Sequence, residues 1–284
     1  MKSILITGGT GSFGRAFVQH LLDTTDCERI CIFSRGEHIQ AQVREAMGDN
    51  ARLRFFIGDV RDRWRLTRAA HRVDVIVHAA ALKRIEVGFY NPIEMVRTNI
   101  EGAINVVEAA RDAGVKKVVG LSTDKAYQPI SPYGQSKALA ERIFLAANDG
   151  HGPAFSVTRY GNVWNSAGSV YPTWRRILAS GASTVPITDP DCTRFFMYMR
   201  EAVELVCSAI SGDRDLYIPT LPAYRLGTIA EALGVKYNVI GLPEWEKKHE
   251  SMGAGNDSST ARKLTVDELR TIIAETNAST SIGS

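Results

Sequence analysis

The chain has 284 residues, 44% of them hydrophobic, which is enough to build a sizeable core in a two-lobed protein. Its 34 basic and 31 acidic residues leave a net charge of +3 and are dispersed, which argues against a nucleic-acid-binding surface. The four cysteines form no C-x-x-C pair and have no companion histidine cluster, so we expect neither a metal site nor disulfides. With no signal peptide and no apolar run of about 18 residues, we expect a cytoplasmic protein without a membrane span.

The N-terminal segment predicts a nucleotide site. Lys2–Thr7 reads as a buried strand that runs through a glycine-rich turn into a helical stretch, Arg15–Leu22. The turn has the spacing G-x-x-G-x-x-G, and its glycines let the backbone approach a pyrophosphate whose charge faces the helix start. A plain tight turn is the alternative. The predicted cofactor contacts in the turn are Gly8, Thr10, Gly11, Ser12, Phe13 and Gly14.

Strand-like and helix-like segments alternate through the first 160 residues. The further predicted strands are Arg29–Phe33, Leu53–Ile57, Asp74–His78, Lys117–Leu121 and Phe155–Thr158. The longest helical pattern runs from Pro92 to Ala113, with apolar residues at three- and four-residue steps. This alternation predicts an α/β fold, a Rossmann-like doubly wound parallel sheet covered on both faces. Ligands of such sheets bind at the carboxyl ends of the strands.

After residue 160 the pattern loosens into segments rich in turn residues. We assign residues 1–160 to a nucleotide-binding domain, to which 195–218 return as a helix (Met199–Ile210) and a strand (Asp215–Ile218). Residues 161–194 and 219–284 form a smaller substrate-binding lobe. Its last helix is predicted to start with a capping box between Thr265 and Glu268.

The end of the second strand bears on the choice between NAD and NADP. An acidic residue there binds the ribose 2′-hydroxyl, whereas this strand ends in Ser34-Arg35. A hydroxyl and a guanidinium suit a 2′-phosphate, so NADP is predicted, with a solvated surface arginine as the alternative. Asp59 is expected to receive the adenine amino group, and small residues after strand four let the backbone pass close to the cofactor. The further predicted cofactor contacts are Asp59, Val60, Ala79 and Ala80.

Tyr133 and Lys137 indicate catalysis. They lie four residues apart, so on a helix they share a face, and they follow strand five and Thr123. A nearby ammonium lowers the pKa of a phenol and makes the phenolate a usable base. Lys137 is also expected to contact the cofactor. An ordinary surface pair is the alternative.

Motifs along nearly the whole chain resemble the extended short-chain dehydrogenases/reductases that modify sugar nucleotides. LSTDKA is the most specific of them, and it resembles the inverting UDP-N-acetylglucosamine 4,6-dehydratases, whose product feeds pseudaminic acid and related polysaccharide sugars. Relatives with a retaining outcome carry Thr-Asp-Glu there. The matching stretches are TGGTGSFG (7–14), FFIGDVRD (55–62), HAAALK (78–83), YNPIE (90–94), TNIEGA (98–103), LSTDKA (121–126), RYGNV (159–163), PITDP (186–190) and TRF (193–195).

The resemblance implies a cycle of C4 oxidation, loss of water across C5 and C6, and hydride return to C6. Tyr133 would take the 4-hydroxyl proton while Thr123 bonds that hydroxyl. Lys125, when neutral, would remove the C5 proton, and Asp124, when protonated, would protonate the departing 6-hydroxyl. A salt-bridged loop pair is the alternative for Asp124 and Lys125. Tightly bound NADP would be regenerated in each turnover.

The resemblance also implies substrate contacts and a homo-oligomer. Lys83 would meet the sugar or diphosphate, and Asn162 and Arg194 the diphosphate of a UDP-N-acetylhexosamine. For Arg194 a salt bridge inside the second lobe is the alternative. The chain departs from the family where Ala167 replaces an arginine and Trp245 a glycine, and it is shorter between Glu250 and Ser258.

Two rival functions remain at this stage. A nucleotide-sugar epimerase or 5,6-dehydratase of the same fold would use the same Tyr133, Lys137 and cofactor. A non-catalytic protein that senses NADP(H) would not need either residue.

Overall fold

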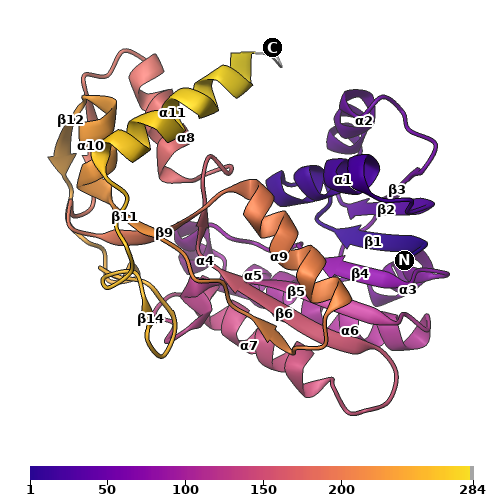
Figure 1. The fold of residues 1–284 in the computed structure, drawn as a ribbon. Coiled ribbons are helices and arrows are strands. Elements are labelled where there is room, and N and C mark those ends of the chain that lie inside the picture. Colours follow the sequence, from indigo (N-terminus) through magenta and orange to yellow (C-terminus); the bar gives the residue numbers. More distant parts are fainter. Residues whose placement is uncertain (282–284) are drawn as a thin grey trace. The chain divides into compact units, whose positions relative to one another are not determined.

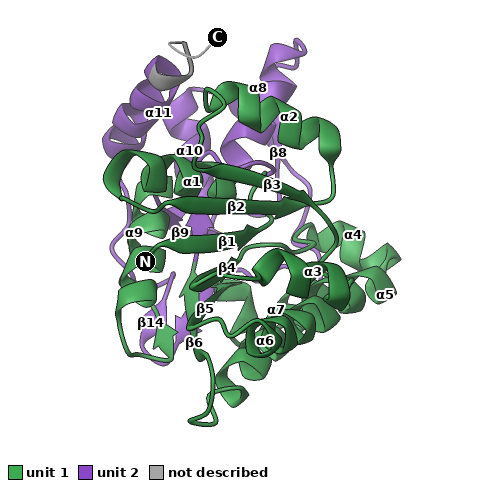
Figure 2. Ribbon diagram, turned by 90° about the vertical axis from the view of Figure 1, so that its right-hand side faces the viewer, with its two compact units in different colours: residues 1–160, 199–219 green, residues 161–198, 220–284 purple. Residues whose placement is uncertain are grey.

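The computed structural model describes residues 1–281, and the chain divides into two compact units. Unit 1 comprises Met1–Tyr160 and Met199–Pro219, and unit 2 comprises Gly161–Tyr198 and the chain from Thr220 onward (Figure 2). The sequence-based boundary assigned residues 195–198 to the first domain. They belong to unit 2, because β9 (Thr193–Met197) pairs with two strands of that unit. The last three residues of the predicted lobe lie outside the described residues.

Unit 1 is built on a seven-stranded parallel sheet (Figure 1). Its strands are β1 (Ser3–Thr7), β2 (Arg29–Ser34), β3 (Leu53–Ile57), β4 (Val75–His78), β5 (Lys117–Thr123), β6 (Ala154–Tyr160) and β10 (Leu216–Tyr217). They lie in the order β10-β6-β5-β4-β1-β2-β3, and every neighbouring pair is parallel. The strand order therefore reverses between β1 and β4, which is where doubly wound sheets bind ligands. The predicted Rossmann-like fold is confirmed.

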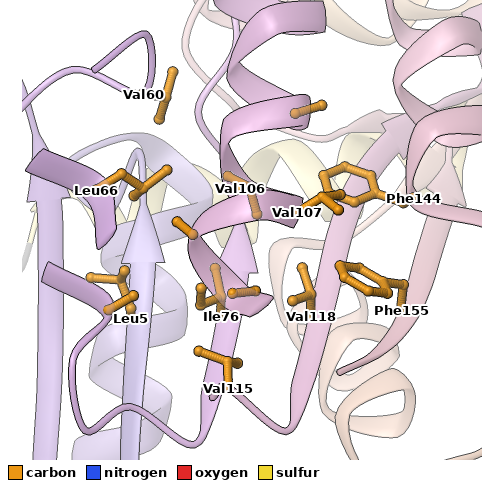
Figure 3. Packing of buried hydrophobic residues seen from close by; sticks show 14 of the residues in the cluster. Leu5, Val60, Leu66, Ile76, Val106, Val107, Val115, Val118, Phe144 and Phe155 are labelled. Atoms are coloured by element: carbon orange, nitrogen blue, oxygen red, sulfur yellow. The ribbon is translucent and has the colours of Figure 1, made fainter. Parts of the chain in front are cut away.

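Helices cover both faces of this sheet. The helices of unit 1 are α1 (Ser12–Thr24), α2 (Glu37–Ala46), α3 (Arg63–Ala70), α4 (Ile85–Tyr90), α5 (Pro92–Met95), α6 (Gly102–Asp112), α7 (Pro132–Ala146) and α9 (Met199–Ser211). α1 contacts α9 on one face, and α6 contacts both α3 and α7 on the other (Figure 1). Between the sheet and this second layer, Ile76 and Val118 pack with Val106 and Phe144 in a fully apolar core (Figure 3).

The prediction of one continuous helix from Pro92 to Ala113 is wrong. The pattern is interrupted by a π-helical turn, Val96–Glu101, between α5 and α6. Such turns are frequent at functional sites. Here the turn holds Asn99, which is buried and bonds both main-chain groups of Leu82. Hydrophobic periodicity cannot reveal this insertion, because the apolar residues on either side keep their helical spacing.

The described residues of unit 2 form short strands, helices and an aromatic core. Its strands are β7 (Asn162–Val163), β8 (Thr184–Ile187), β9, β11 (Ala223–Arg225), β12 (Lys236–Val239), β13 (Ser251–Gly253) and β14 (Asn256–Asp257), and its helices are α8 (Val170–Ala179), α10 (Leu226–Leu233) and α11 (Val266–Ser281). Trp164 stacks on Tyr171 with ring centroids 4.7 Å apart. The predicted capping box is confirmed: Thr265 N donates to Glu268 at 2.8 Å, and Glu268 N donates to Thr265 Oγ1 at 3.2 Å.

Candidate active site

The glycine-rich turn brings β1 and the loop after β4 into close contact. Gly8 has a φ of +68°, and a Cβ there would lie 2.8 Å from Ala80 N, so only glycine fits. A Cβ on Gly14 would lie 2.5 Å from Gly9 Cα, which lets the first turn of α1 pack onto the loop. Gly11 caps α1 and brings no side chain to its N-terminus. The turn therefore presents bare backbone at a helix start, which suits a pyrophosphate.

The other predicted residues of the turn have local roles. Thr10 accepts a hydrogen bond from Arg15 Nε at 2.9 Å through its carbonyl oxygen. Ser12 is the first residue of α1, and Phe13 stacks on Phe17 with ring centroids 5.5 Å apart. These contacts fix the start of the helix, so the turn is held before any ligand binds.

Gln40 organises the end of β2, a role that the sequence analysis missed. Its buried side-chain amide donates to Ser34 O at 3.0 Å, to Ser34 Oγ at 2.9 Å and to Phe56 O at 3.0 Å. These bonds fix the Ser34 hydroxyl at the carboxyl end of the strand. Arg35 follows with an exposed guanidinium 4.0 Å from the Asp59 carboxylate. A cation and an oriented hydroxyl thus lie next to each other where the ribose of a dinucleotide is expected.

Asp59 is engaged by arginine in this structure. Its carboxylate accepts bonds from Arg61 Nε at 2.9 Å and Arg61 Nη2 at 2.7 Å. Burial alone would raise the Asp59 pKa, but the hydrogen bonds and charge of Arg61 outweigh it and lower that pKa. Val60 is buried, and its carbonyl oxygen accepts a bond from Asn105. An Asp59 contact with an adenine amino group would share the carboxylate with Arg61.

Thr7 and His78 join β1 to β4. The Thr7 hydroxyl lies 2.8 Å from His78 Nδ1 and accepts from Ala80 N at 3.3 Å, while Ala79 N donates to Thr7 O at 3.1 Å. Burial, with a smaller contribution from the Lys137 cation, lowers the pKa of His78 to about 3. The imidazole is therefore neutral and holds the predicted Ala79 and Ala80 backbone against the glycine turn.

The end of β5 gathers three of the predicted catalytic side chains. The Thr123 hydroxyl donates to Asp124 Oδ1 at 2.9 Å, and Lys125 Nζ donates to the same oxygen at 3.1 Å. Asp124 is fully buried, and among the described residues its Oδ2 has no hydrogen-bond partner. An unsatisfied buried carboxylate oxygen is costly, which favours its contact with a hydroxyl group.

Helix α7 brings Tyr133 to the same place. Pro132 and the Ser131 cap, whose hydroxyl accepts from Gly134 N at 3.2 Å, start the helix. A Cβ on Gly134 would lie 2.4 Å from Lys125 O, so the first turn packs directly onto the Asp124–Ala126 turn. Burial raises the pKa of Tyr133 to about 12, while the Lys125 cation and a hydrogen bond with Thr123 act to lower it.

Lys137 lies one helical turn beyond Tyr133 and is buried. Burial lowers its pKa to about 8, and the Glu141 carboxylate one turn further opposes that shift. The sequence analysis expected the Lys137 cation to lower the phenol pKa of Tyr133. The structure differs, because burial raises that pKa and the cation that acts against the rise is Lys125. Four predicted catalytic residues, Thr123, Asp124, Lys125 and Tyr133, therefore lie together, with Lys137 behind them on α7.

Asn99 connects the loop after β4 to α7, a role that the sequence analysis did not assign. Its Nδ2 donates to Leu82 O and to Ser136 Oγ, both at 2.9 Å, and Ser136 in turn bonds Tyr133 O. Lys83, a predicted substrate contact, is the residue directly after Leu82. Partial burial of its ammonium and the neighbouring Arg84 cation lower the pKa of Lys83. The TNIEGA motif contained Asn99, but only the π-helical turn shows why that position is an asparagine.

The predicted residues of unit 2 have contacts of their own. Arg194 is buried, donates to Thr193 O at 2.7 Å and to Lys248 O at 3.1 Å, and forms an ion pair with Glu246. The salt-bridge alternative for Arg194 is thus realised here. Asn162 lies on β7 and is half-buried. Ala167, where the family has arginine, is exposed in the loop between β7 and α8.

Neither a membrane-spanning helix nor a metal-binding cluster occurs in the described part of the chain. Among residues 1–281, no helix combines the length and the hydrophobicity needed to cross a membrane. In the same part of the chain, no group of three or more His, Cys, Asp or Glu side chains is arranged to hold a metal ion.

Comparisons with known proteins place the chain among carbohydrate-modifying enzymes. Residues 4–270 match the family described as polysaccharide biosynthesis protein. The chain is 42% identical over 264 residues to a UDP-N-acetylglucosamine 4,6-dehydratase (inverting) of Campylobacter jejuni, an alignment that covers 90% of this chain and 79% of that protein. It is also 40% identical to a UDP-glucose 4-epimerase of Rickettsia prowazekii, over 93% of this chain and 81% of that one.

Solved structures agree on the fold. The X-ray structure of Pen from Bacillus thuringiensis superposes with a TM-score of 0.90 at 30% identity and covers 96% of this chain and 98% of that one. A dTDP-glucose 4,6-dehydratase from Streptomyces venezuelae with NAD bound has a TM-score of 0.82 at 23% identity, with 96% of each chain covered.

The parallel sheet, the glycine turn and the Tyr133–Lys137 helix define a member of the extended short-chain dehydrogenases/reductases. Within this class, the chain belongs to the polysaccharide biosynthesis protein family.

Proposed function

We propose that this chain is an NADP-dependent nucleotide-sugar 4,6-dehydratase that acts on UDP-N-acetylglucosamine and inverts C5. The observation that carries the proposal is the buried Asp124, which holds Thr123 and Lys125 on one oxygen and leaves the other without a partner among the described residues. Elimination needs an acid and a base close together, and this cluster provides both beside Tyr133. The 42% identity to an inverting dehydratase supports the same reaction.

The residues at the carboxyl ends of β1 and β2 fit a dinucleotide. A Cβ at Gly8 would fill the close approach to Ala80, and Gly11 leaves the start of α1 open to an anion. Ser34 and Arg35 would hold a ribose 2′-phosphate, which favours NADP over the NAD seen in solved relatives. A cofactor bound there would accept the hydride from C4 and donate it to C6.

The side chains of unit 1 would move the protons. Tyr133 would receive the 4-hydroxyl proton, and the Lys125 cation and the Thr123 bond act against the rise in its phenol pKa that burial causes. Lys125, once neutral, takes the C5 proton. C5 would later take one proton from solvent as the hydride returns to C6, and Tyr133 would return its proton to solvent. Asp124, once protonated, would give that proton to the departing 6-hydroxyl as water leaves. Because Lys125 Nζ lies 3.1 Å from Asp124 Oδ1, a proton passed between them converts the ion pair into the required neutral pair.

The substrate contacts belong to the same proposal. Lys83 would neutralise part of the substrate's negative charge, and Asn162 would donate to its diphosphate. Arg194 would bind the diphosphate only by exchanging its bond with Glu246, so we propose it as a contact that forms on binding. We further propose that the enzyme is a homo-oligomer.

The test is mass spectrometry of the purified protein incubated with UDP-N-acetylglucosamine in deuterated water and no added cofactor. A product that has lost one water and carries one solvent deuteron at C5 would support the dehydratase and a co-purifying cofactor. NMR of that sample gives the configuration at C5, and the nicotinamide released on denaturation is identified as NADP or NAD. Unchanged substrate in the presence of bound cofactor would rule out this substrate.

A second candidate is a nucleotide-sugar 4-epimerase, favoured by the 40% identity to proteins of that name. The same incubation separates the two reactions. An epimerase yields a C4 epimer with no loss of water, and it has no use for Asp124 and Lys125 as acid and base.

A further inference from the structure

Glu141 is a buried acidic residue that the proposed chemistry does not use. It lies on α7, one turn beyond Lys137 and two beyond Tyr133, and its residue is 5% exposed. Its Oε1 accepts from Ser122 Oγ at 2.5 Å and from Arg159 Nε at 2.9 Å, and its Oε2 forms an ion pair with Arg159 Nη2. A buried carboxylate with this many donors is fixed in position.

The partners of Glu141 belong to the segment that carries the acid and base. Ser122 is the residue before Thr123 on β5, and Arg159 is its register partner on β6. The Arg159 guanidinium also lies 5.9 Å from the ring centroid of Tyr127, directly after the Asp124–Ala126 turn. The Glu141–Arg159 pair therefore contacts the residues just before and just after the Thr123–Lys125 cluster.

The proposed catalytic residues come from two separate segments, and their spacing must be held. Thr123, Asp124 and Lys125 are at the end of β5, whereas Tyr133 and Lys137 project from α7. We propose that Glu141 is a positioning residue that fixes α7 to the end of β5 and keeps a negative charge beside Lys137. The proposal rests on the proposed function, because it deepens the account of the same site.

The charge of Glu141 has a measurable consequence for Lys137. The groups around this ammonium are Glu141 and Tyr133 on its own helix, His78 on β4, and the Asp124–Lys125 pair beyond Tyr133, with Arg159 behind Glu141. Burial lowers the Lys137 pKa to about 8 and Glu141 opposes this, so loss of the carboxylate would lower that pKa further. Activity that needs cationic Lys137 is lost as the pH rises through its pKa. Without Glu141 that loss occurs at lower pH.

Two substitutions of Glu141 separate the effect of its negative charge from the effect of its side-chain length. Glu141→Gln keeps the shape and removes the charge, so the alkaline limb of kcat is expected to move to lower pH by about one unit. Glu141→Asp keeps the charge but shortens the side chain, so the limb stays while kcat falls by roughly 10- to 100-fold with little change in KM. An unmoved limb in folded Glu141→Gln protein would overturn the electrostatic role, and unchanged kcat in Glu141→Asp would overturn the positioning role.

Glu141→Gln removes the carboxylate charge that pairs with the buried Arg159 guanidinium, and the variant could fail to fold for that reason. The double variant Glu141→Gln with Arg159→Met removes both charges and is expected to fold while keeping the shifted limb. A double variant with the wild-type limb contradicts the proposal. Asp149→Asn, which removes a carboxylate from the exposed pair with Arg111, is the matched control and should leave the limb unchanged.

The titration of Lys137 can be followed without any substrate. Carbon-13 NMR of the reductively methylated full-length protein, assigned with Lys137→Arg, reports the Lys137 pKa in wild type and Glu141→Gln. A lower pKa in the variant supports the proposal, and equal values reject its electrostatic part. If wild-type protein releases no water from UDP-N-acetylglucosamine, the proposed function fails, while the NMR comparison still decides the role of Glu141.

Discussion

Each unit of the molecule contains a buried pair of opposite charges, and the two pairs differ in how completely their polar atoms are satisfied. In unit 1, Asp124 holds both Thr123 and Lys125 on Oδ1, and its Oδ2 has no partner within the described part of the chain. In unit 2, Arg194 donates to two backbone carbonyls and pairs with Glu246. The Asp124–Lys125 pair therefore has an oxygen atom available to a bound molecule. The donors of Arg194 are instead bonded to acceptors within unit 2.

The chemistry of the two cations explains the difference. A guanidinium does not lose its proton in proteins, so the Arg194 pair stays ionic and contributes a fixed link within unit 2. An ammonium can become neutral when buried, so the Lys125–Asp124 pair can exchange a proton internally. We infer that the Asp124–Lys125 pair serves the proposed reaction, whereas the Arg194–Glu246 pair links segments within unit 2.

The largest expected effect is from Lys125. Lys125→Ala should lower the rate of water loss by about 10²- to 10⁴-fold, because the base at C5 is gone. Cofactor content, measured by absorbance of the purified variant, should not change. Lys125→Arg keeps the positive charge but cannot become neutral, so it should be equally inactive. An active Lys125→Arg enzyme would mean that the charge alone is needed.

The Arg194 pair should matter for the stability of unit 2, in addition to the contact that we propose for Arg194 with a bound diphosphate. Arg194→Met removes the buried cation that pairs with Glu246, so we expect the free energy of unfolding to fall by about 3 kcal/mol or more. Denaturant unfolding measures this change. Arg194→Met with Glu246→Gln should recover part of the loss. If Arg194→Met is fully stable but binds UDP poorly, Arg194 serves the ligand and the contrast between the two pairs fails.

Gly134 tests how tightly the two catalytic segments are joined. In Gly134→Ala the new methyl group would lie 2.4 Å from Lys125 O, so α7 must move. We expect a loss of about 1–3 kcal/mol of stability together with a lower kcat. Gln135→Ala, at the next and exposed position of the same helix, is the control and should change stability by less than about 0.5 kcal/mol. Equal kcat values for the two variants would show that the spacing is not critical.

The smallest effect is expected at Arg35, whose guanidinium is exposed and 4.0 Å from Asp59. Arg35→Ala should weaken NADP binding by roughly 1 kcal/mol, or about fivefold, and leave NAD binding nearly unchanged. Calorimetry on protein stripped of its cofactor gives both dissociation constants. Equal losses for NAD and NADP would remove Arg35 from recognition of the 2′-phosphate.

The local sequence pattern was sufficient to predict much of the fold of unit 1. Its strands are short apolar runs and its glycine turn lies between a strand and a helix, so alternation alone predicted the parallel sheet. The Thr265–Glu268 capping box was equally readable, because both partners are three residues apart. The π-helical turn at Val96–Glu101 was not, since Asn99 is held there by Leu82, 17 residues away.

The sequence by itself determined the fold class and the glycine turn, because these depend on residues that are neighbours in the chain. Its motifs also predicted Thr123, Asp124, Lys125 and Tyr133 as site residues, through their resemblance to a family. Only the tertiary structure decided which polar atoms have hydrogen-bond or ion-pair partners. Arg194 reads as a ligand for a phosphate in its motif, yet its partner Glu246 lies 52 residues away. Glu141 and Arg159 lie 18 residues apart and meet only because β5, β6 and α7 pack together. Long-range packing sets burial and pairing, and these in turn set the charge state of each group.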